Sequence, residues 1–488
     1  MNSPLICLAV DLGAGSGRVV AGVFTGDRLE LVELTRFTNE PIKIGDGWHW
    51  NLGKLLQNIK AGITLATKRY GDSVVSLGVD TWGVDYGLLD DKGKLSSVPF
   101  QYRDTRTNGM QEKAFARMPA AEIYRRTGIQ FMFFNTLFQL LAEKELDPHG
   151  QLLFMPDLVH YYLTGTAANE KTIASTSQLF DPRRQEWDYD LIRAMNLPPV
   201  IFGKLIDPGT ILGDLLPEIA KEVGAKKLMV IAPAGHDTAS AVVGVPAEES
   251  EPVFLSSGTW SIIGRELDAP IISVDSFNAT FSNEGGAFGT TCFLKNVAGM
   301  WLLQECKRIW DSEGRSISFG ELVAHAESSP PFQSLIDPDA ADFQTPLSMP
   351  EAIIAFCRRT GQNPPETPGG FARVILESLA LKYRMVKESL AGVTGKPVEK
   401  VYIVGGGSQN KLLNQFAADA MGCPIVAGPV EATSIGNILM QLYALGRLRS
   451  LAECRALVRR SFETNVFVPE ETTRWDAAFM RFKTILAV

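Results

Sequence analysis

Asp237 has the setting of a general base. It lies in the segment Gly235-His236-Asp237-Thr238, which follows a short buried strand expected at residues 228–232 and precedes the small residues 239–243. A strand end holds a carboxylate rigidly, and small residues let the backbone approach a ligand closely. Asp237 could therefore accept a proton from a hydroxyl group. Alternatively, it caps the helix that begins here, because aspartate is a common N-cap residue.

A glycine-rich turn near the N-terminus could bind phosphate. The segment DLGAGSGR places Asp11 at the end of an expected strand, followed by the small residues 13–17. Backbone amides in such a turn can point at an anion, and Asp11 would then face a Mg²⁺ ion on the phosphate. The alternative is an ordinary hairpin turn. A dinucleotide-binding motif or a P-loop is excluded, because the turn leads into a strand and no Gly-Lys-Ser/Thr follows.

Two further turns of small residues lie in the second half of the chain. FLSSGTWS contains Thr259 between two expected strands, and VGGGSQN contains Gly406 between a strand and a helix. The second turn is better placed for a nucleotide, because a helix N-terminus and free amides attract phosphate. Each could be a simple turn when considered alone. Together with residues 13–17, they predict ATP bound in a cleft between two halves of similar construction.

The segment DTWGVD at residues 80–85 could contact a sugar. Trp82 offers a flat apolar face to a sugar ring or a deoxy methyl group, and Gly83 leaves room for close approach. The alternative for Trp82 is a place in the hydrophobic core.

Short strands and capped helices must position these residues. Apolar runs and period-2 patterns predict strands at 5–11, 18–24, 29–37, 74–80, 228–232 and 401–404, and a helix over 53–69. A second strand-turn-strand unit at 253–267 has the same plan as the first. Another helix should begin at Asn410 and stop at Gly422. The Pro/Gly-rich segment 363–370 is expected to be a surface loop.

Length and composition fit two globular domains. A chain of 488 residues is longer than a domain with a single hydrophobic core usually is. Residues 244–252 have the composition of a junction, so we expect domains of 1–245 and 246–488. No stretch approaches 18 apolar residues, so no membrane partner is expected. A formal net charge of −8 argues against a nucleic-acid partner. The six scattered cysteines form no CxxC pair and are expected to be buried thiols in the cytoplasm.

Taken together, the motifs resemble the FGGY carbohydrate kinases. The resemblance extends over residues 11–437 and is carried by DLGAGSGRV, DTWGVD, YRDTRTNG, GIQFMFFNTL, GHDTASAV, FLSSGTWS, NEGG, WLLQ, VGGGSQN and AGPVEATSIGN. It implies an α/β fold of two actin-like (ribonuclease H-like) domains, with mixed central sheets flanked by helices and the active site in the cleft between them. The N-terminal domain would bind the sugar and supply the base, and the C-terminal domain would bind the nucleotide.

The resemblance also implies roles for individual residues. Asp237 matches the proton acceptor of the family, and Asp11 matches its metal-facing aspartate. The positions that match sugar contacts are Gly83, His236, Asp237, Thr238 and Asn296. The positions that match ATP contacts are Ala14, Gly15, Ser16, Gly17, Arg18, Thr259, Gln304 and Gly406.

Within this family, the motifs are most similar to the branch that phosphorylates L-rhamnulose. The implied reaction transfers the γ-phosphoryl group of ATP, with Mg²⁺, to the 1-hydroxyl of that ketose in L-rhamnose catabolism. A kinase for fuculose, xylulose or ribulose is one alternative. A non-catalytic sugar sensor or an actin-like scaffold is another, although neither would need Asp237 as a base. The expected partners are the ketose and ATP, and the expected assembly is a monomer or a small homo-oligomer.

Overall fold

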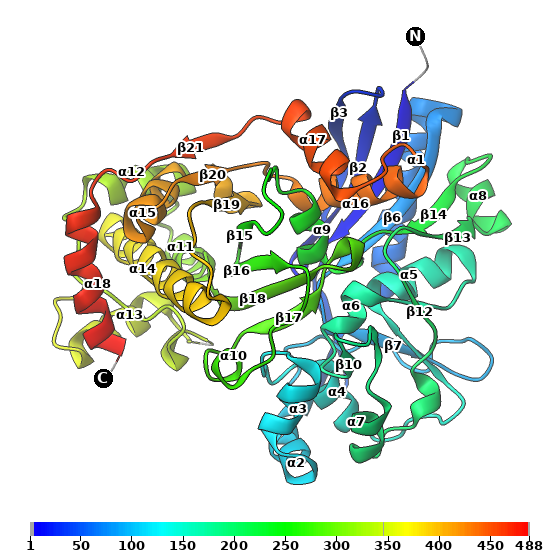
Figure 1. The fold of residues 1–488 in the computed structure, drawn as a ribbon, viewed down its shortest axis with the longest axis horizontal. Coiled ribbons are helices and arrows are strands. Elements are labelled where there is room, and N and C mark those ends of the chain that lie inside the picture. The colour runs from blue at the N-terminus through cyan, green and yellow to red at the C-terminus, as the bar shows by residue number, and fades with distance from the viewer. Residues whose placement is uncertain (1–3, 345, 487–488) are drawn as a thin grey trace. The chain divides into compact units, whose positions relative to one another are not determined.

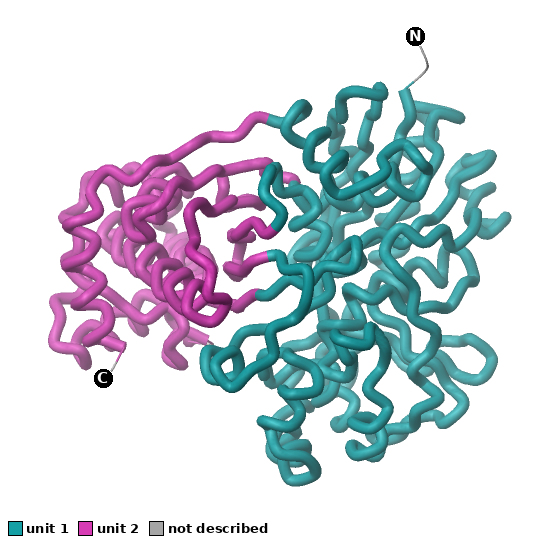
Figure 2. Tube along the Cα trace, in the orientation of Figure 1, with its two compact units in different colours: residues 1–250, 266–293, 432–462 teal, residues 251–265, 294–431, 463–488 magenta. Residues whose placement is uncertain are grey.

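The chain forms two compact α/β units, neither of which is continuous in sequence (Figures 1 and 2). A computed structural model describes residues 4–344 and 346–486. The first unit consists of the chain up to Ser250, Glu266–Phe293 and Ala432–Phe462. The second consists of Glu251–Arg265, Leu294–Glu431 and the chain from Glu463. Each unit has a sheet flanked by helices, so the expected fold class is confirmed.

A mixed sheet forms the centre of the first unit. Its strands have the order β13-β14-β6-β1-β2-β3. Strands β1, β6 and β14 are parallel to one another, whereas β1, β2 and β3 form an antiparallel meander. The bounds are β1 Leu5–Leu12, β2 Ser16–Phe24, β3 Leu29–Thr38, β6 Val74–Thr81, β13 Thr210–Asp214 and β14 Met229–Ala232. The strands predicted in this region are therefore confirmed.

Strand β1 shows why helices cover both faces of this sheet. Side chains alternate along a strand, and between Ile6 and Val10 both sets of β1 are apolar and buried. Ile6, Leu8 and Val10 pack in the cluster that contains the apolar stripe of helix α1 (Leu52–Tyr70). Cys7 and Ala9 pack in another cluster, with residues of helix α16 (Ala432–Ala444). The helix predicted over 53–69 is confirmed as α1.

Helix α16 also packs closely against helix α9 (Asp237–Val243), which carries the predicted base. The two helices meet at Gly436, where a Cβ atom would overlap the backbone carbonyl of Ser240. A glycine at this position is therefore required for the approach of the two backbones. The position of Asp237 thus depends on a helix almost 200 residues further along the chain.

The second unit has a hairpin of the same plan. Strand β15 (Val253–Ser257) is antiparallel to β16 (Trp260–Leu267) and parallel to β19 (Val401–Val404), as β1 is antiparallel to β2 and parallel to β6. Strand β20 (Ile425–Ala427) continues the parallel set and pairs with β21 (Asn465–Phe467). The strand-turn-strand unit predicted at 253–267 is confirmed.

Helix α15 (Lys411–Met421) begins and ends where its sequence predicts. The Asn410 side chain accepts a hydrogen bond from the Leu413 amide at 3.1 Å, and Gly422 ends the helix with a φ of 63°. The loop predicted at 363–370 is wrong in its last three residues, because helix α14 (Pro368–Thr394) already includes them. Thr367 caps this helix through the Gly370 amide, and a proline is well tolerated at the first helical position.

The cysteines are buried thiols, as the sequence predicts. Cys7, Cys292, Cys306, Cys357, Cys423 and Cys454 are all free thiols and all buried. No helix among the described residues is long and apolar enough to cross a membrane.

Replacing Gly436 with alanine should destabilise the protein by about 1–3 kcal/mol, because the added methyl group forces α16 away from α9. Urea unfolding followed by circular dichroism measures the change. Gly53→Ala is the control, since Gly53 lies in helix α1 of the same unit and the nearest atom to an added Cβ is 4.0 Å away. If the two variants have equal stability, the close packing of α9 on α16 is not a constraint.

Candidate active site

Three aspartates meet at one edge of the first sheet. The register pairs Asp11 of β1 with Arg18 of β2 on one side and with Asp80 of β6 on the other. Strand β14 runs parallel to β6, and the Thr81 amide donates to the Gly235 carbonyl at 2.9 Å just before Asp237. Since parallel strands end at the same edge, β1, β6 and β14 bring Asp11, Asp80 and Asp237 together.

Asp11 is held by one cation and one hydroxyl. Its Oδ2 accepts hydrogen bonds from Arg18 at 2.6 and 3.0 Å and from Ser434 at 2.8 Å. Both partners use the same oxygen. Arg18, which is predicted to belong to the phosphate loop, thus forms an ion pair with Asp11, the predicted metal-facing residue. This ion pair orients the Asp11 carboxylate.

Asp80 lies beside Asp11 on the neighbouring strand β6 and is completely buried. Burial raises the pKa of Asp80 well above its usual value, and the charge of Asp11 raises it further, although a hydrogen bond from Asn437 opposes both effects. That bond, from the Asn437 amide to Oδ2, measures 2.6 Å. Burial and the charge of Asp11 thus favour the protonated form of Asp80, which reduces the repulsion within the group of three.

Asp237 is the most accessible of the three carboxylates, since 32% of its side chain is exposed. It is the first residue of α9, whereas His236 occupies the N-cap position without a side-chain capping bond. Asp237 accepts a hydrogen bond from its neighbour Thr238 at 3.1 Å. Burial raises the pKa of Asp237, His236 opposes this change, and Asp11 adds to it. The geometry therefore does not support the alternative of a helix cap.

The glycine-rich turn contains positions of two kinds. Strand β2 begins at Ser16, two residues earlier than expected, and the Gly13 amide donates to the Ser16 carbonyl at 2.8 Å. At Gly15, a Cβ atom would have no neighbour within 4 Å. At Gly17, it would collide with the ring of Phe37. Gly15 thus leaves open space at the turn, whereas Gly17 is needed for packing.

Gly83 and Trp82 also differ in accessibility. Gly83 lies at the bend after β6, and a Cβ atom there would be 3.2 Å from the Thr176 side chain. Trp82 is only 6% exposed, packs in the core, donates to Asp85 at 2.9 Å and lies 4.2 Å from the ring of Trp50. The core alternative for Trp82 is therefore the observed one.

Three of the predicted nucleotide contacts lie in the second unit. Thr259 lies in the turn between β15 and β16 and donates to Gln304 of helix α11 (Trp301–Ser312) at 3.2 Å. Gly406 lies just after β19, and a Cβ atom added there would have no neighbour within 4 Å. Asn296, a predicted sugar contact, also belongs to this unit, in β18 (Thr291–Ala298).

The structure adds residues that the sequence reasoning did not single out. Asp80, Glu170 and Glu284 are buried carboxyl groups close to the predicted base, and Ser434 and Asn437 reach the site from α16. Asp80 and Glu284 belong to the segments DTWGVD and NEGG. For Asp80, the available signal was a charged residue at the end of an apolar strand, since a buried charge requires a specific partner.

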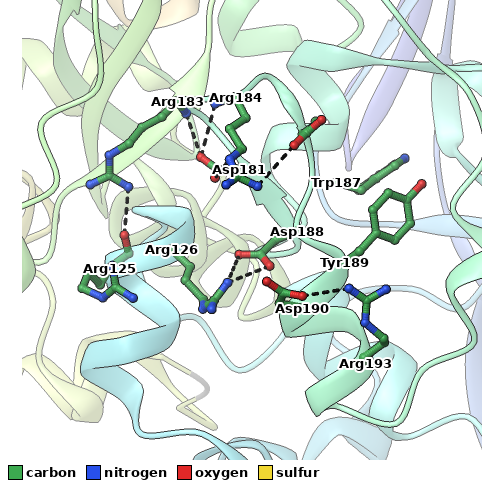
Figure 3. Close-up of a pocket in the computed structure, with 11 residues that line it drawn as sticks. Arg125, Arg126, Asp181, Arg183, Arg184, Trp187, Asp188, Tyr189, Asp190 and Arg193 are labelled. Atoms are coloured by element: carbon green, nitrogen blue, oxygen red, sulfur yellow. Dashed lines mark hydrogen bonds and ion pairs between the residues drawn. The ribbon is translucent and has the colours of Figure 1, made fainter.

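A surface hollow of about 670 Å³ contains none of the predicted site residues (Figure 3). It is lined by arginines and carboxylates of residues 125–193. Arg126 contacts Asp188 at 2.9 Å, Arg193 contacts Asp190 at 2.8 Å and Arg184 contacts Glu186 at 3.5 Å. These three pairs compensate one another's charge, whereas Arg183 donates to the backbone carbonyl of Arg125 at 2.9 Å.

The fold is that of two-domain sugar kinases. The solved structure of gluconate kinase from Lactobacillus acidophilus matches this chain with a TM-score of 0.83, covering 99% of this chain and 98% of that protein at 16% identity. At this identity, the match shows the fold alone.

The chain belongs to the FGGY family of carbohydrate kinases. The model of the N-terminal domain of this family matches residues 6–244, and the model of its C-terminal domain matches residues 253–445. A rhamnulokinase of Bacteroides thetaiotaomicron is 44% identical over 480 residues, which cover 97% of this chain and 98% of that protein. A rhamnulokinase of Oceanobacillus iheyensis is 38% identical over 461 residues, covering 93% and 97%.

Replacing Asp80 with asparagine should change the free energy of unfolding at pH 7 by less than about 1 kcal/mol, because the amide resembles the protonated acid. The folded state keeps a proton that the unfolded chain has already released, so wild-type stability should fall as the pH rises through the raised pKa. The variant should lack this part of the pH dependence. Urea unfolding between pH 5 and pH 9 measures both effects, and a loss of several kcal/mol at pH 7 would mean that Asp80 is ionised.

Proposed function

We propose that this protein transfers the γ-phosphoryl group of ATP to the 1-hydroxyl of L-rhamnulose, giving L-rhamnulose 1-phosphate and ADP in L-rhamnose catabolism. The observation that carries this proposal is the identity of 38–44% with rhamnulokinases over nearly the whole chain. The accessible carboxylate of Asp237 supports it, because phosphoryl transfer to an alcohol needs an acceptor for the hydroxyl proton.

In this mechanism, Asp237 is the catalytic residue. The sugar oxygen attacks the γ-phosphorus while its proton passes to the Asp237 carboxylate, and the bond from the γ-phosphorus to the β,γ-bridging oxygen breaks to release ADP. Gly83, His236, Thr238 and Asn296 would contact the ketose. The bend at Gly83 and the loop before α9 lie at the same edge of the sheet as Asp237, which supports this assignment.

ATP would contact small-residue turns of both units. Ala14, Gly15, Ser16, Gly17 and Arg18 supply the turn after β1, and Thr259, Gln304 and Gly406 supply the turns of the second unit. Backbone amides in such turns favour phosphate oxygens. The open space at Gly15 and Gly406 supports close approach of a nucleotide. We therefore propose that domain 246–488 binds most of the nucleotide, with residues 14–18 at its phosphates, and that domain 1–245 supplies the base and the sugar contacts other than Asn296.

Asp11 is the residue that would face Mg²⁺. Its Oδ2 is engaged by Arg18 and Ser434, and both bonds leave Oδ1 to a metal ion or its water. No group of three or more His, Cys, Asp or Glu side chains within the described ranges could hold a metal by itself. This agrees with the usual binding of Mg²⁺ through one or two carboxylates plus the substrate phosphates. When bound, the ion would neutralise charge on the phosphate oxygens.

We also propose that the reaction takes place in the cytoplasm. Six free, buried cysteines suit a reducing compartment, because disulfides form mainly in oxidising ones.

Replacing Asp237 with asparagine should lower kcat by about 10² to 10⁴-fold, because the amide keeps the volume of the side chain but cannot accept the hydroxyl proton. A coupled ADP assay with L-rhamnulose and ATP measures kcat, and the KM values of both substrates should change much less. The control is Asp190→Asn, an exposed aspartate of the same unit whose side chain is 67% accessible.

An Asp237→Asn enzyme that retains more than about a tenth of the activity would rule out the base. The same assay over L-fuculose, D-xylulose and D-ribulose tests the substrate. A higher kcat/KM for one of these ketoses than for L-rhamnulose would overturn the proposed specificity while keeping the kinase activity.

Replacing Gly406 with valine should weaken ATP binding at least about tenfold and leave ketose binding unchanged, since the branched side chain occupies space open to a ligand. No protein atom lies within 4 Å of the added Cβ, so the fold should tolerate it. Titration calorimetry with a non-hydrolysable ATP analogue measures the affinity. Gly392→Val, at an exposed glycine of helix α14 in the same unit where an added Cβ also has no neighbour within 4 Å, is the control for a general loss of stability. Unchanged nucleotide affinity would remove Gly406 from the site.

A further inference from the structure

A row of three ionisable side chains ends at the predicted base. The Nε2 atom of His236 lies 3.4 Å from Oδ1 of Asp237, and its Nδ1 atom lies 3.3 Å from Oε2 of Glu284. All three residues belong to the first unit. The side chains of His236 and Glu284 are only 10% and 9% exposed, whereas that of Asp237 is 32% exposed. The row therefore leads from a buried carboxylate to an accessible one.

Glu284 lies in strand β17 (Ser282–Gly285), and the residues on both sides of it form hydrogen bonds to other segments. The Asn283 amide donates to the Gly128 carbonyl at 2.8 Å, and the Gly285 amide donates to the Ser175 hydroxyl at 2.7 Å. These bonds fix the backbone on either side of Glu284. Its carboxylate thus lies at a defined position beside the ring of His236, which is what a residue that orients another requires.

The backbone of His236 is held by a separate group. Oε2 of the buried Glu170 accepts a hydrogen bond from the Gly235 amide at 2.8 Å, and the Thr172 hydroxyl accepts one from the His236 amide at 3.2 Å. Glu170 also accepts bonds from Thr172 and Ile173, so its oxygens serve the backbone and the α6 segment (Lys171–Ser175). Glu170 therefore fixes the loop, and Glu284 faces the imidazole ring.

The charges around His236 favour its imidazolium form. Burial alone lowers the pKa of His236, but Glu284, Asp237 and the more distant Glu170 together raise it above the usual value. The imidazolium in turn opposes the rise in the pKa of Asp237 that burial and Asp11 cause. Asp11 is flanked in turn by Asp80, whose raised pKa favours its neutral form, and by Arg18, with which it forms an ion pair.

We propose that Glu284 is a positioning residue, which acts through His236 to keep the Asp237 carboxylate ionised and oriented toward the hydroxyl group that it deprotonates. This inference rests on the proposed function, because it assigns Asp237 as the base. In this role, Glu284 acts through the His236 ring and not by direct contact with the sugar or ATP. It supplies the fixed negative charge that lets a buried histidine carry a positive one.

The kinetic test is Glu284→Gln, which keeps the shape of the side chain and removes its charge. Without that charge, His236 becomes neutral at a lower pH and Asp237 is protonated up to a higher pH. The variant should therefore lose about tenfold or more in kcat near pH 6, and the loss should shrink toward pH 9, where Asp237 is ionised without help. The KM for ATP should not change.

The control is Glu122→Gln, the same substitution at a partly exposed glutamate of the same unit that pairs with Arg125 and Arg126. It should leave the pH profile unchanged. An equal loss of kcat by Glu284→Gln at every pH would indicate only a structural role, and the absence of any loss would remove Glu284 from the reaction. Either result overturns the proposal.

A second measurement reads the charge of His236 directly and does not depend on activity. Nitrogen-15 chemical shifts of labelled histidine distinguish imidazole from imidazolium, and the missing signal of a His236→Gln variant identifies His236 among the five histidines. Wild-type His236 should titrate above the ordinary value of about 6.5. Its midpoint should fall in Glu284→Gln.

A wild-type midpoint at or below the ordinary value overturns the proposal even if the Glu284 variant fails to fold. If the wild-type protein phosphorylates no ketose, the proposed function fails instead. The titration of His236 still decides whether Glu284 keeps this histidine charged.

Discussion

The structure of the first unit depends on holding three carboxyl groups together at one sheet edge. Like charges at this distance repel strongly in a medium of low dielectric constant, and burial penalises each charge further. Each group is accommodated in a different way. Asp11 pairs with Arg18, the raised pKa of Asp80 favours its neutral form, and Asp237 remains partly exposed beside His236. Only one of the three is consequently both accessible and able to accept a proton.

This arrangement requires helix α16, at which the chain returns to the first unit after residues 294–431 of the second unit. Its polar residues Ser434, Asn437 and Gln441 are spaced three and four apart, so they form a single stripe on the helix. Ser434 donates to Asp11, Asn437 to Asp80 and Gln441 to the Leu8 carbonyl. A helix that was apolar on this face would leave the buried carboxyl groups without partners, which costs more than the packing would gain.

The features of the site that depend on neighbouring residues in the chain could be predicted from the sequence. The strand ends at Asp11 and Asp80 follow from apolar runs that stop at a charge, and the cap at Asn410 follows from residue type alone. The start of α14 at Pro368 was missed because proline marks both a loop and the first turn of a helix. Glu284 could not be assigned a role, since its partner His236 is 48 residues away and only the folded chain brings them together.

The roles of single glycines also could not be predicted from the sequence alone. A glycine-rich turn is compatible with phosphate binding, but the sequence cannot tell which glycine serves the ligand and which serves the fold. At Gly17 and Gly407, a side chain would collide with Phe37 and with Ser257, so these glycines are needed for packing. At Gly15 and Gly406, the same test finds open space. The fold itself would therefore accept a larger residue at Gly15 and at Gly406. Close approach of a ligand would explain why glycine occupies both positions.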